Sequence, residues 1–358
     1  MNIGIDARMS GPTVGGGGLG RYVEQLICEL PNVDSVNRYV LFGKEKAADI
    51  PWYTLKEQIL LPAIIDREHL DLIHFPHWNV PILLKTPFVV TIHDLILLEE
   101  PKSARATTRH PIVYALKYAG FKRVLAHSVS ASKKIITVSE ATKRSILTHF
   151  PNVSEKKIVV IYEGVSPLPP VASSAPLVPD PFLLCVGNAY PHKNLDVLLR
   201  AFDQLHVRQP EIHLVFAGRD DVFSRSLQKR AQQSLAQSHI HFIFSPNDED
   251  LSGLYHHAKA YLFPSRIEGF GLPALEAMAA GVPVIASAIP ALKEILGDSA
   301  LFFPVHDPSA LALTIEQLLN DPQKQQTLVQ KGFERIKRYS WTAMARQTVQ
   351  VYTSCDRT

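Results

Sequence analysis

The sequence predicts an α/β protein of two doubly wound domains, each a parallel sheet with helices on both faces. At 358 residues the chain exceeds the size of one ordinary hydrophobic core. Short runs of Val, Ile, Leu and Phe without a polar alternate face recur between helical patterns, as in strands that are buried on both sides. A proline-rich stretch, SPLPPVASSAPLVPDP, separates two similar halves, since proline neither continues a helix nor donates to a β-ladder.

Each half contains six strand candidates. In the first half they are residues 2–6, 39–42, 71–75, 88–94, 135–139 and 158–162. In the second half they are residues 182–187, 213–218, 240–244, 260–265, 282–287 and 300–304. Helices have to cover both faces of such strands, which predicts βαβ units. We expect the ligand in a cleft where the carboxyl ends of both sheets meet.

The composition is that of a soluble globular protein, with 46% hydrophobic and 20% charged residues. A formal net charge of only +3 gives no support to a nucleic-acid partner. The three cysteines lie far apart without metal or redox spacing, which favours a reducing compartment. The N-terminus lacks the apolar run of a signal peptide, and Lys85, His93 and Asp94 interrupt the longest apolar region. We therefore expect a cytoplasmic protein.

One segment of the first half is basic. Residues 101–139 contain no Asp or Glu, and their basic side chains are Lys102, Arg105, Arg109, Lys117, Lys122, Arg123, Lys133 and Lys134. Apolar residues are interleaved with them, namely Ile112, Tyr114, Leu116, Phe121 and Leu125. The pattern has two interpretations: a solvated helix face, or a peripheral surface that rests on anionic lipid at the inner face of the membrane.

The segment FPSRIEGFGLPALEAMAAGVPVIAS is the most informative for chemistry. A strand ends there, and a loop leads into a helix with Pro273 at its first position, where a missing N–H costs least. Gly269 and Gly271 let the backbone approach a ligand, and the free N–H groups of the helix start favour a phosphate. Glu268 in the loop and Glu276 in the first turn would repel that phosphate. We therefore expect both carboxylates to accept hydrogen bonds from ribose or sugar hydroxyls.

A second glycine-rich stretch, GPTVGGGGLGRYVEQL, lies near the N-terminus. Gly15, Gly17 and Gly20 have the spacing of a dinucleotide fingerprint. That fingerprint turns directly out of its strand and needs an acid after the second strand, where this sequence has Gly43 and Lys44. We interpret the match as a coincidence, which removes the main support for an NAD-dependent oxidoreductase. The bare backbone can still approach a phosphate before the following helix, so the expected contacts are Gly15, Gly16, Gly17 and Gly18.

Three other stretches carry candidate polar residues. Lys193 in VGNAYPHKN lies at a helix entry, either as a point charge on a pyrophosphate or as a solvated side chain beside a helix cap. His93 in VVTIHDL follows a strand, and roles as a general base, a metal ligand or a loop anchor stay open. Asp248 and Asp250 in SPNDEDL have the D-x-D spacing of a metal site, but they lead into a helical pattern. We interpret them as residues of a helix start.

Together these segments resemble the family-four (group 1) retaining glycosyltransferases, and the bacterial mannosyltransferases among them. EGFGLPALE looks like the E-x7-E signature of that family, with Glu268 and Glu276 as its two acids. Similar segments of the family match GGGGLGRYVEQL, VVTIHDL, IITVSEATKRSI, CVGNAYPHKNLDVLLRAF and the closing YSW with its helix. The resemblance thus extends along nearly the whole chain.

The resemblance implies the GT-B fold, in which two Rossmann-like domains face each other. We expect an acceptor-binding domain at residues 1–170 and a nucleotide-sugar-binding domain at residues 171–340. The last helix of the family crosses back to the first domain, which assigns residues 341–358 to it. In this sequence that helix is amphipathic, because apolar residues recur at helical spacing: Trp341, Ala345, Val349 and Tyr352.

The resemblance also implies roles for the candidate residues. Glu276 would hold the donor ribose, and the donor sugar would contact Glu268 and the backbone of its loop. The expected donor site consists of the four N-terminal glycines, Asn188, Lys193, Glu268, Gly269, Phe270, Gly271, Leu272 and Glu276. The catalytic candidates are His93, Lys193 and Glu268. An arginine is common in the family at the position of Asn188, and Arg266 or His192 could replace its charge.

We therefore expect a retaining glycosyltransferase that moves a hexose from a nucleotide sugar to a glycan or lipid-linked saccharide in surface polysaccharide biosynthesis. GDP-mannose is the first candidate donor, and UDP-glucose and its relatives stay open. The resemblance implies no metal, no other cofactor and no covalent nucleophile. Two alternatives are a sugar-nucleotide epimerase of the same fold and a non-catalytic nucleotide-sugar-binding protein.

Overall fold

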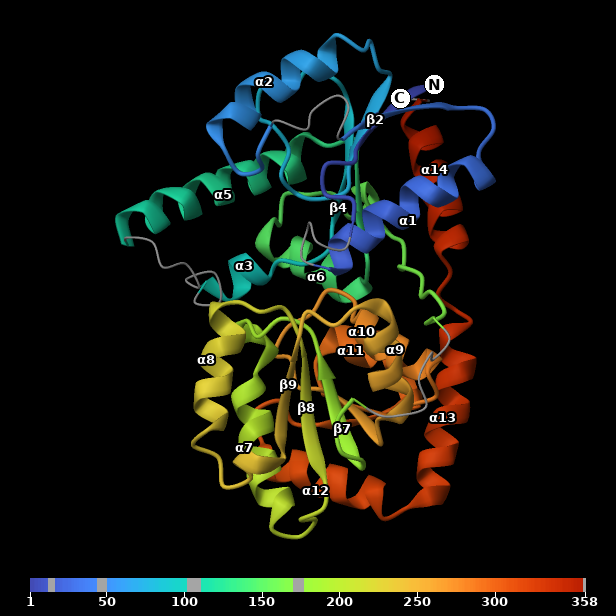
Figure 1. Ribbon diagram of the computed structural model, residues 1–358. Helices are drawn as coiled ribbons and strands as arrows, with labels where there is room; N and C mark the ends of the chain where they lie inside the picture. The colour runs from blue at the N-terminus through green and yellow to red at the C-terminus, as the bar shows by residue number, and fades with distance from the viewer. Residues whose placement is uncertain (12–16, 44–49, 102–110, 170–176, 357–358) are drawn as a thin grey trace. The chain divides into compact units, whose positions relative to one another are not determined.

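The computed structural model divides the chain into two compact units, whose elements are labelled in Figure 1. Unit 1 comprises Met1–Leu98, Thr107–Gly164 and Tyr339–Thr358, and unit 2 comprises Glu99–Ala106 and Val165–Arg338. The structure describes residues 1–11, 17–43, 50–101, 111–169 and 177–356. The expected domain boundary between residues 170 and 171 lies outside the described residues.

Unit 1 is built on a parallel sheet with the strand order β2-β1-β3-β4-β5-β6. The strands are β1 (Asn2–Asp6), β2 (Arg38–Phe42), β3 (Leu72–Phe75), β4 (Phe88–Ile92), β5 (Lys134–Thr137) and β6 (Ile158–Val160). The helices are α1 (Gly18–Val33), α2 (Leu55–Asp66), α3 (Ile96–Glu99), α5 (Pro111–Ala131), α6 (Glu140–His149) and α14 (Trp341–Asp356), with a 3-10 turn at Glu155–Lys157. Every residue of β3 and β4 is buried, as expected for strands covered on both faces.

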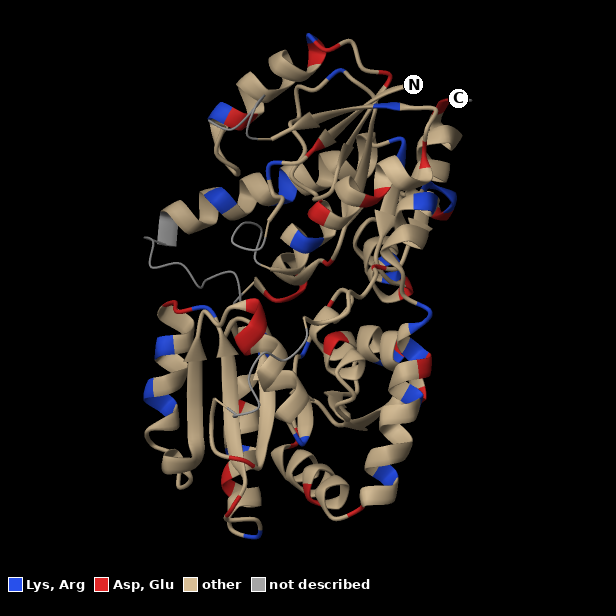
Figure 2. Cartoon of the chain, turned by 45° about the vertical axis from the view of Figure 1, so that its right-hand side comes forward, with Lys and Arg blue, Asp and Glu red and all other residues tan. Residues whose placement is uncertain are grey.

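Unit 2 is built on a second parallel sheet, with the order β12-β11-β10-β7-β8-β9. The strands are β7 (Phe182–Val186), β8 (His213–Gly218), β9 (Ile240–Phe244), β10 (Ala260–Phe263), β11 (Val284–Ser287) and β12 (Ala300–Phe303). The helices are α7 (Leu195–His206), α8 (Val222–Ala231), α9 (Asp248–His257), α10 (Leu272–Ala279), α11 (Pro290–Leu296), α12 (Pro308–Leu319) and α13 (Pro322–Ile336), with 3-10 turns at Pro191–Lys193, Gln237–His239 and Gly297–Ser299. These six strands carry no Lys, Arg, Asp or Glu, and the charged residues of unit 2 lie on its helices and loops (Figure 2).

The two sheets confirm the predicted α/β class, and every strand candidate contains a strand. The last helix, α14, belongs to unit 1 as expected and contacts α1. Its start packs against Gly164, where an added Cβ would lie 2.3 Å from the backbone nitrogen of Trp341. A glycine is therefore required at the point where the returning helix meets unit 1.

Each sheet has a switch point, a place where the strand order reverses. In unit 1 it lies between β1 and β3, and in unit 2 between β7 and β10. In open α/β sheets, ligands bind outside the carboxyl ends of the strands at such points. Within the described part of the chain, no helix combines the length and the hydropathy needed to cross a membrane.

Candidate active site

Two loops of unit 2 meet at its switch point. The loop after β7 begins at Gly187, whose φ of 137° favours glycine, and it ends at Asn194, which has a φ of 58° and starts α7. The buried Asn194 amide donates to the carbonyl oxygens of Pro264 at 3.0 Å and Val305 at 2.8 Å. Asn194 thus fastens the loop after β7 to the loop after β10. Sequence reasoning placed a helix start here and missed this bond, because its partners are far away in the chain.

Lys193 and Glu268 form an ion pair between these two loops. The Nζ atom of Lys193 lies 2.6 Å from Oε1 of Glu268 and 5.5 Å from the centre of the Phe263 ring. The two side chains are only 19% and 10% exposed, so solvent screens the pair weakly. The structure therefore brings together two of the three predicted catalytic residues.

The loop that carries Glu268 leads directly into α10. Gly271 caps this helix with a φ of 107°, and a Cβ there would lie 2.9 Å from Cδ2 of Leu292. Leu272 is the first helical residue and Pro273 the second, one position later than predicted. Gly269 and Phe270 are buried in the turn before them. The first-turn N–H groups have no partners within the helix, so this end can receive an anion or a hydroxyl oxygen.

Glu276 lies in the second turn of α10, since the helix begins at Leu272 and its first turn contains no acid. This corrects the predicted first-turn position, which placed the helix start too late. The carboxylate is 5% exposed, and its Oε2 accepts a hydrogen bond from the Tyr255 hydroxyl at 3.0 Å. A charge so deeply buried needs such partners. Tyr255, on α9, was not recognised from the sequence.

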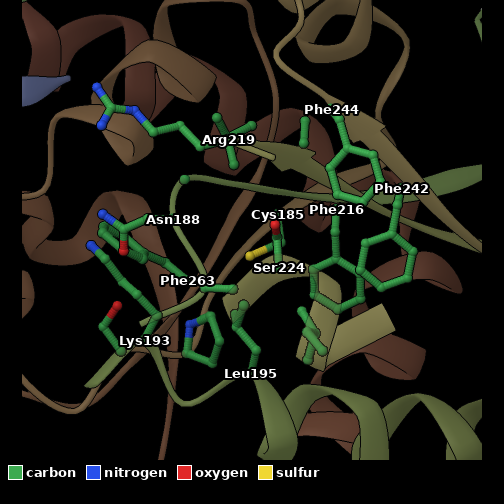
Figure 3. Close-up of a pocket in the computed structure, with 18 residues that line it drawn as sticks. Cys185, Asn188, Lys193, Leu195, Phe216, Arg219, Ser224, Phe242, Phe244 and Phe263 are labelled. Carbon is green, nitrogen blue, oxygen red and sulfur yellow. The ribbon is translucent and has the colours of Figure 1, made fainter. Parts of the chain in front are cut away.

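A pocket opens beside this pair at the carboxyl ends of β7, β8, β9 and β10 (Figure 3). Phe216, Phe242 and Phe244 provide an aromatic wall, and Lys193 contributes a cation. Two lining atoms, Oδ1 of Asn188 and Oγ of Ser265, are buried and have no hydrogen-bond partner in the described part of the chain. Buried polar atoms without partners are costly, so a ligand that donates hydrogen bonds would be favoured here.

The two expected replacements for a cation at Asn188 are both unsuited to that role. The Nε and Nη2 atoms of Arg266 donate to Glu100 at 2.8 and 2.7 Å, which neutralises the guanidinium. His192 is 7% exposed, and burial, followed by the charge of Lys193, lowers its pKa to about 4. Its ring is neutral at pH 7. The second cation at the pocket is Arg219, at the end of β8 (Figure 3).

The third predicted catalytic residue, His93, belongs to unit 1 and follows β4. Its Nδ1 lies 3.0 Å from Oε1 of Glu163, and its Nε2 lies 3.0 Å from the carbonyl oxygen of Pro76. Both partners are hydrogen-bond acceptors, and one contact on each ring nitrogen fixes the orientation of the imidazole. The backbone carbonyl accepts a further bond from Thr142 at 3.0 Å. Glu163 was not predicted, because nothing in its local sequence marks it.

The N-terminal glycine loop is described only in part. Gly15 and Gly16 lie outside the described residues. Gly17 has a φ of 93° and Gly18 is the first residue of α1, which has no side-chain cap from the described residues. The first N–H groups of a helix have no partner within it, and a ligand contact of this loop stays a prediction.

The D-x-D acids take part in a helix start. Asn247 caps α9, and its side chain accepts the backbone N–H of Asp250 at 2.7 Å. Asp248 and Asp250 lie in the first turn, where carboxylates are favoured by the helix dipole. The structure thus confirms the interpretation of these two acids as residues of a helix start.

The chain matches two families of sugar-transferring enzymes. Residues 16–167 match the family described as Glycosyltransferase Family 4, and residues 172–335 match Glycosyl transferases group 1. The chain is 31% identical over 301 residues to the O-antigen chain mannosyltransferase B of Escherichia coli, covering 80% of this chain and 75% of that protein. The chain belongs to the group 1 (family 4) glycosyltransferases.

Two further comparisons agree with this assignment. The serotype-specific mannosyltransferase WbdA of Escherichia coli is 28% identical over 326 residues, which are 87% of this chain but 39% of WbdA. The crystal structure of HepE from Anabaena in complex with UDP-glucose gives a TM-score of 0.74 at 16% identity, covering 99% of this chain and 100% of HepE. The likeness to HepE concerns the fold, which is the GT-B fold.

Proposed function

We propose that this protein is a retaining mannosyltransferase that extends a glycan or lipid-linked saccharide of a bacterial surface polysaccharide, with GDP-mannose as its first candidate donor. The observation that carries the proposal is the Lys193–Glu268 pair beside the pocket of unit 2. It offers a cation for a pyrophosphate and a carboxylate for sugar hydroxyls. The relatives named as O-antigen and serotype-specific mannosyltransferases support the choice of mannose.

In this proposal unit 2 binds the donor and unit 1 the acceptor. Lys193 contacts the pyrophosphate, Glu268 and the turn at Gly269 and Phe270 hold the sugar, and Glu276 holds the ribose. The aromatic wall of the pocket suits the face of a nucleobase. Asn188 and Ser265 supply polar atoms for which the described residues offer no partner.

The proposed reaction breaks the bond from the anomeric carbon to the phosphate and forms a bond from that carbon to the acceptor oxygen. The acceptor attacks from the face from which the phosphate leaves, and the phosphate takes the acceptor proton. Lys193 stabilises the negative charge that grows on the leaving group. We propose separately that His93 stabilises the transition state, and the kcat of a His93→Gln variant tests this role. No metal ion takes part in these steps.

A mass-spectrometric transfer assay tests the function. The purified protein is incubated with pooled GDP- and UDP-linked sugars and a bacterial lipid extract. We expect one hexose to be added to an acceptor, with the α-linkage of the donor kept, as NMR of the product would show. Conversion of the sugar of the nucleotide sugar into an epimer, in the absence of an acceptor, would indicate the epimerase. A thermal shift with a nucleoside diphosphate, but no turnover with any acceptor, would indicate a binding protein.

A peripheral position on the inner face of the membrane belongs to the same proposal. Helix α5 exposes Leu116 by 70% and Val113 by 42%, and Lys122 Nζ lies 5.4 Å from the centre of the Tyr118 ring. Lys102, Arg105 and Arg109 of the basic segment lie outside the described residues. Vesicle sedimentation decides the matter: retention by phosphatidylglycerol vesicles alone indicates a lipid surface, and equal partitioning with neutral vesicles indicates a solvated helix face.

A further inference from the structure

Unit 1 contains a pocket of its own at the switch point between β1 and β3. The pocket is small and open to solvent, and it lies where the loops after these two strands meet. Its polar lining residues are Asp6, Arg8, His77 and Asn79. None of them was a candidate in the sequence analysis, and the roles proposed above use none of them.

A buried ion cluster forms one wall of this pocket. The guanidinium of Arg8, 3% exposed, is held between two carboxylates. Its Nε and Nη2 donate to Asp6 at 2.8 and 2.7 Å, and Nη2 also lies 2.7 Å from Oε1 of Glu57. The other oxygen of Glu57 accepts the Asn79 amide at 2.7 Å and the backbone N–H of Tyr53 at 2.8 Å.

The cluster has two carboxylates and one guanidinium, so it carries an excess negative charge. Glu57 is fully buried, whereas the Asp6 side chain is 11% exposed and lines the pocket. The Oδ2 atom of Asp6 is described with one partner, Nη2 of Arg8, and a carboxylate oxygen can accept a second bond. The pocket therefore suits ligands that donate hydrogen bonds, and it repels phosphates and other anions.

His77 and its neighbours add a neutral polar atom and an aromatic surface. Burial lowers the pKa of His77 to about 3, and its buried Nδ1 has no hydrogen-bond partner among the residues that the structure describes. Tyr53 is 52% exposed and stacks on Trp78, with ring centres 5.4 Å apart, while the His77 and Trp78 rings lie 4.7 Å apart. Tyr53 has a φ of 59°, and a strained residue of this kind often marks a binding site.

We propose that this pocket binds the terminal sugar of an uncharged acceptor glycan, with Asp6 and His77 bonded to its hydroxyls and Tyr53 stacked on its ring. Sugars combine hydroxyl donors at the edge with apolar C–H faces. The pocket presents partners for the hydroxyls, and Tyr53, whose ring centre lies 6.0 Å from that of the lining residue His77, presents an aromatic face beside it. The inference rests on the proposed function and narrows the class of acceptor. It states that the end of the glycan to which the sugar is added carries no phosphate.

The test measures acceptor binding separately from donor binding. Tyr53→Ala removes an exposed ring. Asp6→Asn removes the negative charge of the carboxylate that would accept hydrogen bonds from the sugar. Leu55→Ala, at an 81% exposed position two residues away, and Asp71→Asn, at an exposed carboxylate, are the matched controls. Saturation-transfer NMR with α-mannobiose and with mannose 6-phosphate reports binding, and steady-state kinetics give KM for α-mannobiose and for the donor.

We expect wild type to bind α-mannobiose and not mannose 6-phosphate. In both variants the acceptor KM should rise about tenfold or more, with donor KM unchanged and both controls like wild type. An unchanged acceptor KM in folded Tyr53→Ala protein, or equal binding of the phosphorylated sugar, would overturn the proposal.

If the Asp6→Asn protein does not fold, the acceptor KM of Tyr53→Ala alone tests the proposal. If wild type binds a nucleotide sugar but transfers it to no acceptor, the proposed function fails, while the NMR result still decides the pocket.

Discussion

Lys193 and Glu268 touch at 2.6 Å across a sequence separation of 75 residues. In this arrangement each charge neutralises the other before a ligand arrives. A pyrophosphate that takes the ammonium would release the carboxylate, which could then accept hydrogen bonds from the sugar. One ion pair would thus prepare both ends of the donor site, and donor binding would be coupled to the breaking of that pair.

Lys193→Met is expected to reduce kcat on the order of 100-fold, because it removes a charge that stabilises the leaving phosphate. Steady-state kinetics with saturating acceptor measure the effect. Lys259→Met is the control, since Lys259 forms a similar but exposed pair with Asp180 at 3.1 Å in the same unit. Equal kcat values in the two variants would show that Lys193 has only a structural role.

Glu276→Ala is expected to raise the donor KM about tenfold or more, since a charged hydrogen bond contributes roughly 1.5–3 kcal/mol. Tyr255→Phe removes only the hydroxyl that donates to Glu276 at 3.0 Å, and we expect a smaller increase from it. Isothermal titration with GDP and with free mannose separates the two parts of the donor. Unchanged GDP affinity in a folded Glu276→Ala protein would contradict the ribose assignment.

Gly17→Val is expected to abolish most transfer while the protein still folds. Gly17 has a φ of 93°, which a β-branched residue rarely adopts, yet an added Cβ would meet no atom within 4 Å. The strain would therefore displace the loop and the start of α1 rather than the core. Gly120→Ala, inside α5, is the control. Normal kcat in Gly17→Val would remove the loop from the proposed donor site.

Unit 1 is expected to lose stability as the pH falls below about 6.5. Burial, followed by the charge of His93, lowers the pKa of His74 from 6.5 to about 3. The unfolded chain then binds a proton that the folded chain does not, so the loss begins at the unfolded pKa and continues toward pH 3. Between pH 6.5 and 5 this group contributes a loss of about 2 kcal/mol.

Urea unfolding at pH 7 and pH 5 measures this dependence. All three tryptophans, Trp52, Trp78 and Trp341, belong to unit 1, so their fluorescence reports its unfolding. We expect His74→Gln to weaken the dependence without abolishing it, because burial also lowers the pKa of His77 in unit 1 to about 3. His149→Gln, an exposed control, should leave the dependence unchanged. If the His74→Gln protein kept the wild-type pH dependence, the loss of stability at low pH would be due to other groups.

Transfer is expected to persist in EDTA. Asp248 and Asp250, the D-x-D acids, lie in the first turn of α9 beside the Asn247 cap, where they serve the helix start. Asp248→Asn is therefore expected to change the melting temperature slightly and kcat hardly at all. Activity that EDTA abolishes and Mn²⁺ restores would contradict the proposed mechanism.

Local sequence patterns predicted the sheets well. Strands buried on both faces are uniformly apolar, and this pattern is visible without tertiary information. The glycines at 269 and 271, with Glu268, also predicted where a loop meets a helix start. The sequence pattern predicts Pro273 as the first helical residue, but Leu272 occupies that position. Glu276 therefore lies in the second turn of the helix and not in the first.

The partners of the site residues could not be predicted in this way. Tyr255 with Glu276, Glu163 with His93 and Asn194 with Pro264 are pairs that only the fold brings together. Arg266 illustrates the opposite error. In the sequence it resembles a free cation near the phosphate site, but its bond to Glu100 neutralises it. A charge that looks free in the sequence can thus be paired by a residue that only the fold brings near.

The return of α14 to unit 1 has a consequence for the order in which the protein is made. Residues 2–164 leave the ribosome long before Tyr352, whose hydroxyl lies 2.7 Å from Nδ1 of the buried His74. Until then unit 1 lacks the helix that contacts α1, whereas unit 2 is complete at Arg338. We expect the half that is synthesised second to reach its native state first. The first half would meanwhile expose the apolar face that α14 later covers. We therefore expect chaperones to bind this half of the nascent chain.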